Sequence, residues 1–532
     1  MATGRKRILW ADDEIEFLRS HIMFLETRGY SVVPVFCGDD AIELVTDKPN
    51  DFDIVLLDEQ MPGKSGLTTL EKIKEINPDL PVVMVTKSEE EQLMEDALGK
   101  KIDGYLTKPV NPSQILMVCK NLLDSKRIVS NNIAQKYIRN YSQNRSLLAG
   151  HLTIPQWIKL YENITGWDLV LETVDDEGLR QTHSGQKSDF NGKFSSDYIE
   201  HYAAWIRKES DTPMLSTKVI EKYVCPHLND GKRTYMIVLS GMRLDQYIGI
   251  ENILKKFYKV DRNYFFSTLP TDDTFARTSL LSGMFPNEVA EKYDPPWSLG
   301  EGEEEDSLKS HLIEEQLLAD NLARLGYPVP TDEPWFTRIT DRLEPGHLQS
   351  RIESCRKSQL ITFVVDFFDQ VQHALSNSGI LQELTNDESG MRALTRSWFK
   401  RSALLQLLRD IATQDCRVVI MSDHGSILCS RGTELYCARN WETHLRYKFG
   451  TGISCDERTI IYLSDPSHFG LPTFGDDTTC VIAKENYYFV APDKFEHYNE
   501  HYRNTFQQGG VSMEEIIVPV SVLTPGTAKS GE

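Results

Sequence analysis

The stretch VVIMSDHGS, residues 418–426, runs from a series of apolar residues straight into Asp423, His424 and a glycine. A short, continuous run rich in valine and isoleucine is typical of a strand that is buried on both faces of a parallel sheet. In α/β proteins, ligands bind at the carboxyl ends of such strands. The stretch therefore predicts an α/β fold with its chemistry centred on Asp423 and His424.

Two similar runs precede it, TYMIVLSG at residues 234–241 and QLITFVVDFFD at residues 359–369. The second leads into another pair, Asp369 and His373, which share one face if a helix begins there. Carboxylate and imidazole are ligands that zinc favours, and two such pairs could hold two ions beside one phosphate group. Two plainer interpretations stay open: a surface hydrogen bond between Asp369 and His373, and an ordinary turn at SDHG.

The first 124 residues show a second alternation of strand-like and helical runs, which predicts a doubly wound parallel sheet of the (βα)5 type. Asp12 and Asp13 follow one of its strands, and Asp58 ends another. Three carboxylates placed together need a cation, and Mg²⁺ prefers such oxygen ligands. Asp58 is then a candidate acceptor for a phosphoryl group, with the metal and Lys108 neutralising the transferred charge. A helix-capping role for each acid is the alternative.

Composition limits the possible functions. A chain of 532 residues is too long for one core, so two to four domains are expected. The formal net charge of −21 argues against a general DNA-binding surface, because DNA is a polyanion. The nine cysteines include no CxxC pair, which indicates neither a disulfide framework nor a cysteine zinc site. No apolar run reaches the length of a membrane span, so the cytoplasm is the expected location.

The motifs of the first segment resemble those of the response regulator receiver domain. They are WADDE (10–14), LLDEQMPGKSG (56–66), VTKSEEE (85–91) and GYLTKPV (104–110). The resemblance implies that Asp58 is the phosphoacceptor and that a cis peptide bond before Pro109 aims Lys108 at the site. It also implies two sets of supporting residues: Asp12, Asp13 and the main-chain carbonyl of Gln60 for Mg²⁺, and Thr86 with Tyr105 as the switch pair.

Two segments between the motifs carry less information. Residues 125–212 are expected to form a helical connector, in which TIPQWIKLYENIT offers Thr153 as a helix cap and Pro155 in the first turn. A dimer interface and a solvated spacer bundle are both open for this connector. The acidic run EGEEED, residues 301–306, predicts a solvated loop.

From residue 213 onward the sequence resembles the PglZ domain of the alkaline-phosphatase superfamily. The motifs that carry the resemblance are IVLSGMRLDQ (237–246), STLPTDDTFARTSLLSGMFP (267–286), VVDFFDQVQHALSNS (364–378), IMSDHGS (420–426), THLRYKFG (443–450) and QQGGVSMEEIIVPV (507–520). A receiver joined to a PglZ domain resembles the response regulators of type IX secretion. That resemblance implies a sensor histidine kinase, an alternative sigma factor and a secretion-motor protein as partners, and a homodimer is expected on phosphorylation.

The PglZ-like pattern is broken at three positions. Ser240 replaces a metal-binding aspartate, Asp273 takes the place of the threonine or serine nucleophile, and Gln508 replaces a zinc-binding histidine. Four candidate zinc ligands match the pattern: Asp369, His373, Asp423 and His424. Each metal would keep about two good protein ligands, below the usual three or four, so zinc is expected to be weakened or absent. Compensation by Asp273, His497 or His501 is the less favoured alternative.

Two functions from different classes follow. In the first, the chain is a signalling protein with a receiver (1–124), a helical connector (125–212) and a PglZ domain (213–532). Phosphorylation of Asp58 then shifts the receiver between two states and controls a degenerate effector that acts by binding. In the second, the PglZ domain is an active zinc-dependent phosphodiesterase on oligonucleotides, with Thr271 or Thr274 as the nucleophile. The sequence shows no recognisable DNA-binding motif, which disfavours a transcription factor.

Overall fold

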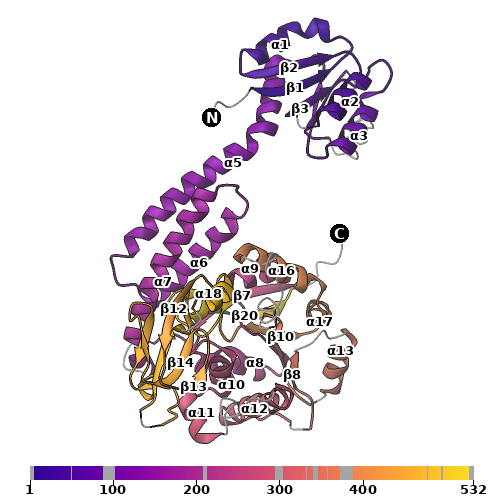
Figure 1. Cartoon of the computed structure of the whole chain (residues 1–532). Helices are drawn as coiled ribbons and strands as arrows, with labels where there is room; N and C mark the ends of the chain where they lie inside the picture. The colour runs from indigo at the N-terminus through magenta and orange to yellow at the C-terminus, as the bar shows by residue number, and fades with distance from the viewer. Residues whose placement is uncertain are drawn as a thin grey trace. The chain divides into compact units, whose positions relative to one another are not determined.

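The computed structural model describes residues 5–49, 51–87, 102–207, 212–293, 303–330, 332–339, 345–355, 357–368, 370–371, 387–475, 477–492 and 495–526. The chain divides into two compact units, Met1–Tyr137 and Ile138–Glu532, and each is described by itself (Figure 1). Among the described residues, no helix is long and apolar enough to cross a membrane. The domain boundaries expected at residues 124 and 212 stay a prediction.

Five strands form the sheet of the first unit, in the order β2-β1-β3-β4-β5, and all neighbours are parallel. Their bounds are β1 (Lys6–Ala11), β2 (Tyr30–Val35), β3 (Ile54–Leu57), β4 (Val82–Thr86) and β5 (Gly104–Thr107). Strands β3 and β4 are buried along their whole length, as their uninterrupted apolar sequences require. The predicted doubly wound parallel sheet is confirmed.

Helices cover both faces of this sheet. They are α1 (Arg19–Glu26), preceded by the turn η1 (Ile15–Leu18), α2 (Gly38–Asp47), α3 (Gly66–Ile76) and α5 (Pro112–Leu147). Leu25 of α1 and Ile115 of α5 belong to the core on one face, and Val45 of α2 and Leu70 of α3 belong to the core on the other. The two cores hold the sheet rigid, so the ends of its strands are well placed to carry a site.

The start of α3 explains why the LLDEQMPGKSG motif ends in a glycine, Gly66. Ser65 caps the helix, and its Oγ accepts a hydrogen bond from the Thr68 N–H at 3.3 Å. A Cβ atom at Gly66 would lie 2.3 Å from the main-chain oxygen of Asp58, well inside van der Waals contact. Glycine is therefore needed for α3 to begin so close to the end of β3.

Two long helices open the second unit. In α6 (Ile154–Leu171), Thr153 forms the predicted cap, a capping box with Gln156, and Pro155 lies in the first turn. The helix α7 (Glu177–Ile206) follows. Both contribute to one core with strand residues of the same unit, among them Trp157, Phe194 and Phe266. These helices therefore pack onto the α/β part of the unit rather than forming a separate core.

The main sheet of the second unit has six strands in the order β7-β20-β10-β6-β9-β8. They are β6 (Arg233–Leu239), β7 (Tyr258–Phe266), β8 (Phe336–Ile339), β9 (Leu360–Val365), β10 (Cys416–Met421) and β20 (Ile517–Pro525). The four strands β10, β6, β9 and β8 are parallel neighbours, and β20 runs antiparallel to both β10 and β7. The three buried strands predicted from the sequence are β6, β9 and β10, and the predicted α/β fold class is confirmed.

Further described helices of the second unit follow, and most of them cover the two faces of this sheet, whereas α18 packs against Tyr488 and Val490 (Figure 1). They are α8 (Cys225–Leu228), α9 (Leu244–Leu254), α10 (Thr278–Ser282), α11 (Pro286–Lys292), α12 (Glu303–Arg324), α13 (Pro345–Ser354), α16 (Glu388–Arg401), α17 (Ala403–Ile411), α18 (Phe495–Tyr502) and α19 (Met513–Ile516). The acidic run was predicted to be a loop, and this is wrong for residues 303–306, which begin α12. Acidic residues at a helix start are favoured by the helix dipole, which explains the difference.

Small antiparallel and mixed sheets follow β10 and are a feature that the sequence did not predict. Four strands pair as β13-β14-β17-β16, three as β15-β12-β18, and two as β11-β19. Their bounds are β11 (Ile427–Cys429), β12 (Arg431–Tyr436), β13 (Arg439–Thr443), β14 (Tyr447–Thr451), β15 (Ser454–Cys455), β16 (Ile460–Leu463), β17 (Thr479–Ala483), β18 (Tyr487–Val490) and β19 (Thr505–Gln507). This subdomain is inserted between the adjacent strands β10 and β20 of the main sheet.

Candidate functional site

The acidic residues predicted in the first unit meet at one edge of its sheet. Asp12 and Asp13 follow β1, and Asp58 follows β3, its neighbour in the sheet. One ligand atom from each of the three carboxylates lies within 4.8 Å of the others. Asp12 and Asp58 are buried, and Asp13 is exposed. Burial is the largest influence on Asp12 and raises the pKa of its carboxyl group, which Lys108 partly opposes.

Lys108 bridges two of these carboxylates. Its Nζ donates to Asp58 Oδ2 at 2.6 Å and lies 2.7 Å from Asp12 Oδ2. Burial acts against the charge on Lys108, but its bonds to the two acids hold its pKa above the usual range. The peptide bond between Lys108 and Pro109 is cis, as expected. The ammonium is thus fixed beside the Asp58 carboxylate, where a transferred phosphoryl group would need positive charge.

The other predicted receiver residues lie around the same edge. Thr86 is buried at the end of β4, and Tyr105 is half-buried on β5. Gln60 is exposed two residues after Asp58. The clustered carboxylate oxygens are the ligands that Mg²⁺ prefers, so the residues present fit this ion, with Asp12, Asp13 and Asp58 as its side-chain ligands.

In the second unit, the carboxyl ends of β6 and β10 meet at Asp423. Its Oδ2 accepts a hydrogen bond from the Ser240 hydroxyl at 3.0 Å, and its Oδ1 accepts from the main-chain N–H groups of Gly241 at 3.0 Å and His424 at 2.9 Å. The Nδ1 atom of His424 lies 3.0 Å from the Gly425 carbonyl oxygen. Asp423 and His424 are completely buried. The sequence therefore placed this pair correctly at the strand end.

An arginine that the sequence analysis did not select lies at the centre of this edge. Arg277 ends the short helical turn η4 (Asp273–Arg277) and is 2% exposed. Its Nη1 donates to Ser240 at 2.9 Å and to Asp366 at 3.0 Å, and lies 3.6 Å from Asp423. Its Nε lies 2.9 Å from Glu314 of α12. One guanidinium is thus surrounded by the acids of two strand ends and two helices, and by the Ser240 hydroxyl at a third strand end.

Asp273, in the predicted nucleophile position, belongs to the same network. Its Oδ2 accepts a hydrogen bond from Arg277 Nη2 at 3.0 Å. Burial opposes ionisation of Asp273, but the charges of Arg277 and its neighbours outweigh burial and lower the pKa of this carboxyl group. Asp366 is held by a second cation, Arg338 of β8. Asp273 is therefore an ionised partner of an arginine.

The neighbouring polar residues have structural partners. Asp272 caps η4, accepting from the Phe275 N–H at 2.9 Å and from the Tyr447 hydroxyl at 2.6 Å. Burial, helped by the charge of Asp273, raises the pKa of Asp272 to about 7. The Thr271 hydroxyl donates to the main-chain oxygen of Gly510 at 2.8 Å. This bond ties η4 to the loop that follows Gln508.

The remaining predicted residues are placed as follows. Gln508 and Thr274 are half-buried, and His501 is exposed on α18. His497 lies on the same helix. Asp369 and His373 lie outside the described residues. Asp366 directly follows β9 and was not among the predicted site residues, although the strand-end rule that selects Asp423 also selects it.

The contacts of the residues described at this edge bear on whether it can hold zinc. Both oxygens of Asp423 already accept hydrogen bonds, and Arg277 supplies the positive charge among the acids. In the part of the chain that the structure describes, the three receiver acids are the one group of metal-type side chains close enough to share an ion. The described residues of the second unit therefore fit an arginine-centred ion-pair network. Because Asp369 and His373 lie outside the described residues, zinc at this edge stays a prediction.

Comparisons with known proteins agree with these two units. Three family models match the chain: the response regulator receiver domain at residues 8–120, the PorX response regulator linker domain at 127–206, and the BREX system PglZ alkaline phosphatase-like domain at 219–523. A receiver domain implies a histidine kinase as its partner. The PglZ match covers more than half of the chain.

Relatives and solved structures resemble part of the chain. Response regulator SaeR of Staphylococcus epidermidis is 32% identical over 162 residues, which are 29% of this chain and 69% of the relative. Transcriptional regulatory protein ResD of Bacillus subtilis is 31% identical over 121 residues, 23% of this chain and 49% of the relative. A CheY-like receiver domain protein of Methanospirillum hungatei is 31% identical, with a TM-score of 0.22, over 23% of this chain and 94% of that structure. The chain therefore belongs to the PglZ alkaline phosphatase-like family, as a fusion in which a response regulator receiver domain and a PorX-type linker precede the PglZ domain.

Proposed function

We propose that this chain is a cytoplasmic two-component response regulator that is phosphorylated on Asp58 and whose PglZ domain acts by binding a partner. The contact that supports phosphorylation is the Lys108 ammonium, 2.6 Å from the Asp58 carboxylate. An oxygen of Asp58 attacks the phosphorus of a kinase phosphohistidine, and the P–N bond breaks as the new P–O bond forms. Lys108 neutralises charge on the transferred group. Bound Mg²⁺ would add a second positive charge for the phosphoryl oxygens.

The phosphoryl group changes the receiver through Thr86 and Tyr105. Thr86 ends β4, the strand beside β3, and its hydroxyl would donate a hydrogen bond to the new phosphoryl oxygens. Tyr105 lies opposite Met84 on the neighbouring strand β5, and it follows the rearrangement of β4. A change on this side of the sheet promotes a homodimer. A sensor histidine kinase, an alternative sigma factor and a secretion-motor protein are the proposed partners.

The PglZ domain is proposed to be a degenerate phosphohydrolase, and the Arg277 network is the observation that carries this proposal. The cation among the strand-end acids is a side chain of the protein itself. The nucleophile position holds Asp273, whose carboxylate is paired with Arg277 and offers no hydroxyl. With neither a hydroxyl nucleophile nor a free acidic cluster, this edge is better suited to holding the domain together than to turnover.

A zinc-dependent phosphodiesterase acting on oligonucleotides is the second candidate. It is supported by the adjacent, fully buried Asp423 and His424 at the end of β10. Asp369 and His373 would complete the ligand set of this alternative. In that case Thr271 or Thr274 would be the nucleophile, although the Thr271 hydroxyl is hydrogen-bonded to Gly510.

Two measurements on the full chain test the proposal. Labelling by acetyl phosphate with Mg²⁺ should be lost in Asp58→Ala and kept in Asp79→Ala, a control at an exposed acid of the same domain. Undiminished labelling of Asp58→Ala would refute the receiver assignment. Zinc content by mass spectrometry and hydrolysis of a nitrophenyl phosphodiester address the effector. Stoichiometric zinc together with diester cleavage would replace the binding proposal by the phosphodiesterase.

A further inference from the structure

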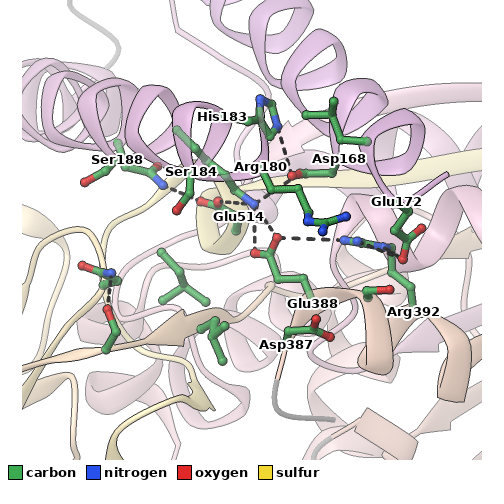
Figure 2. Close-up of a pocket in the computed structure, with 18 of the residues that line it drawn as sticks. Asp168, Glu172, Arg180, His183, Ser184, Ser188, Asp387, Glu388, Arg392 and Glu514 are labelled. Atoms are coloured by element: carbon green, nitrogen blue, oxygen red, sulfur yellow. Dashed lines mark hydrogen bonds and ion pairs between the residues drawn. The ribbon is translucent and has the colours of Figure 1, made fainter. Parts of the chain in front are cut away.

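A charged cavity lies between the linker helices and the PglZ domain, inside the second unit, apart from the strand-end network. Its volume is about 420 Å³. Asp168 of α6 and Lys187 of α7 form part of its wall, and Glu388 of α16 and Glu514 of α19 face them (Figure 2). This volume lies within the range of sites for small organic ligands.

Three carboxylates of this wall share the ammonium of Lys187. Its Nζ lies 3.2 Å from Asp168, 2.8 Å from both oxygens of Glu388 and 3.4 Å from Glu514. Figure 2 shows the carboxylates of Asp168, Glu388 and Glu514 turned toward a common centre. An ammonium has three donor hydrogens, so a single lysine cannot satisfy the oxygens of three acids.

The wider network leaves the same excess of negative charge. Arg392 lies 3.1 Å from Glu172 and 2.9 Å from Asp245. Arg243 pairs with Asp245 and lies 3.4 Å from Glu388. Arg180 is 39% exposed and bonds to Glu177 and to a main-chain oxygen. Three cations, Lys187, Arg243 and Arg392, thus serve five acids: Asp168, Glu172, Asp245, Glu388 and Glu514. His183 Nε2 also lies 3.0 Å from Asp168.

One carboxylate oxygen in the wall has no hydrogen bond from any described residue. Glu514 is 3% exposed, and its Oε2 accepts from Asn191 Nδ2 at 2.8 Å. Its Oε1 accepts none, and Lys187 lies beyond hydrogen-bond geometry from it at 3.4 Å. A buried charged oxygen without a donor is costly, and a donor from a ligand would remove that cost. This atom therefore points to a ligand that donates hydrogen bonds and carries positive charge.

We propose that this cavity binds a small organic cation with primary ammonium groups, of the diamine or polyamine class. One ammonium takes the place beside Glu514 Oε1 and shares Glu388 with Lys187. An anionic ligand would meet the excess of carboxylates and be repelled. A single metal ion is not favoured, because Lys187 occupies the centre that the three carboxylates face, and no three metal-type groups of the described wall lie close enough together to share an ion.

A ligand bound in this cavity would affect the strand end that carries Asp423 and His424, because hydrogen bonds of the main chain join the two places. Asn191 of α7 accepts a hydrogen bond from the Met513 N–H at 2.8 Å, beside its bond to Glu514. The main-chain oxygen of Glu515 accepts from the Gly425 N–H at 3.0 Å. A ligand between α7 and Glu514 therefore tightens the contact of the linker with the loop that carries Asp423 and His424.

Calorimetry on the full chain with putrescine and spermidine, at 0.15 M NaCl, tests the proposal. Glu514→Gln should weaken binding by about tenfold or more, because it removes the charge beside the ligand ammonium. Glu251→Gln is the matched control, since Glu251 is a buried acid of the same unit that pairs with Arg262 and Lys255, outside this cavity. Both variants change the net charge equally, so attraction of polyamines to an acidic chain predicts identical effects.

A second variant keeps the proposal testable if Glu514→Gln does not fold. Ser188→Phe keeps every charge but fills part of the cavity, and it should also weaken putrescine binding while circular dichroism stays unchanged. Equal affinities of the unmodified chain and Glu514→Gln would overturn the proposal. Displacement of putrescine by MgCl₂ at equal concentration would also overturn it, because that result identifies non-specific charge screening.

Discussion

Arg277 Nη1 lies 3.0 Å from Asp366 Oδ1, at the sheet edge where the sequence predicts zinc ligands. Arg338 holds the other oxygen of Asp366, so this buried carboxylate is neutralised from two sides. Both arginines also lie within 4 Å of Glu314. Among the described residues, Arg277 and Arg338 are the cations that pair with the acids of this edge, so disturbing one of them should be costly.

Replacement of Arg277 by glutamine should destabilise the second unit. The change leaves buried carboxylates without their central cation, and breaking a buried pair in this way costs about 3–5 kcal/mol. Urea unfolding measures the effect. Arg401→Gln, at an exposed arginine of the same unit, should change the free energy of unfolding by less than about 0.5 kcal/mol. Equal, small losses in both variants would mean that the network does not stabilise the domain.

Replacement of Lys108 by alanine should strengthen Mg²⁺ binding to the receiver. Lys108 occupies the space between Asp12 and Asp58, and its removal leaves their charges for the metal. We expect Kd to fall by about tenfold, equivalent to about 1.4 kcal/mol. Fluorescence of Trp10, buried two residues before Asp12, can report the titration. Lys87→Ala, an exposed lysine paired with Glu14, is the control and should leave Kd unchanged. A weaker Kd in the Lys108 variant would contradict the expectation.

Beryllofluoride with Mg²⁺ should convert the chain from monomer to dimer. The phosphoryl mimic on Asp58 draws Thr86 toward it, and the change passes to Tyr105 and the surface around it. Sedimentation across a range of concentrations measures the mass. Asp58→Ala should stay monomeric under the same conditions, which separates this response from an effect of the added salts. An unchanged mass of the unmodified chain would exclude phosphorylation-dependent dimerisation.

Combined reversion of Ser240→Asp, Asp273→Thr and Gln508→His should raise zinc content and diesterase activity. Asp273→Thr supplies a hydroxyl and breaks the ion pair with Arg277, and the other two changes add ligand groups. Each single change should have little effect, because residues of one catalytic unit act together. Zinc by mass spectrometry and hydrolysis of a nitrophenyl diester give the readouts. If the unmodified chain already cleaves the diester as fast as the triple variant, the degenerate-effector proposal fails.

The stability of the second unit should contain a pH-dependent contribution from Asp272. Burial raises the pKa of Asp272 to about 7, above its value of 3.8 in the unfolded chain. The folded state therefore binds more protons between these values, and stability falls as pH rises from about 4 to about 7, by up to roughly 1.4 kcal/mol per pH unit. Asp272→Asn should remove this slope in urea unfolding at several pH values. Asp273→Asn should shift the upper end of this pH range downward, because the charge of Asp273 helps to raise the pKa of Asp272. A slope that persists unchanged in Asp272→Asn would assign it to another group.

The sequence predicts the sheet edges well because strand ends are local features. An uninterrupted apolar run followed by a polar residue places Asp58 and Asp423 correctly without any tertiary information. The same rule applied to β9 selects Asp366, but the sequence analysis preferred Asp369 for its spacing to His373. The contact of Asp366 with Arg277 is set by packing, and Asp369 lies outside the described residues.

Features that join distant segments could not be read from the sequence. Arg277 meets Asp423 across more than a hundred residues, and the cavity wall combines Asp168 with Glu514. An arginine in a helical turn has no local pattern that marks it as the centre of a network. The acidic run at residues 303–306 has the composition of a loop, and its helical state depends on packing of the later turns of α12.

Arg277 is a cation that belongs to the polypeptide, so it is always present beside the acids with which it pairs. Arg277 cannot dissociate on dilution or be removed by a chelator, and it keeps its charge over the whole physiological pH range. The ion pairs that Arg277 makes at this edge therefore do not depend on the supply of trace metal. Under the proposed function, starvation for metal would leave these pairs intact, and the binding surface of the effector would stay available when the receiver is phosphorylated.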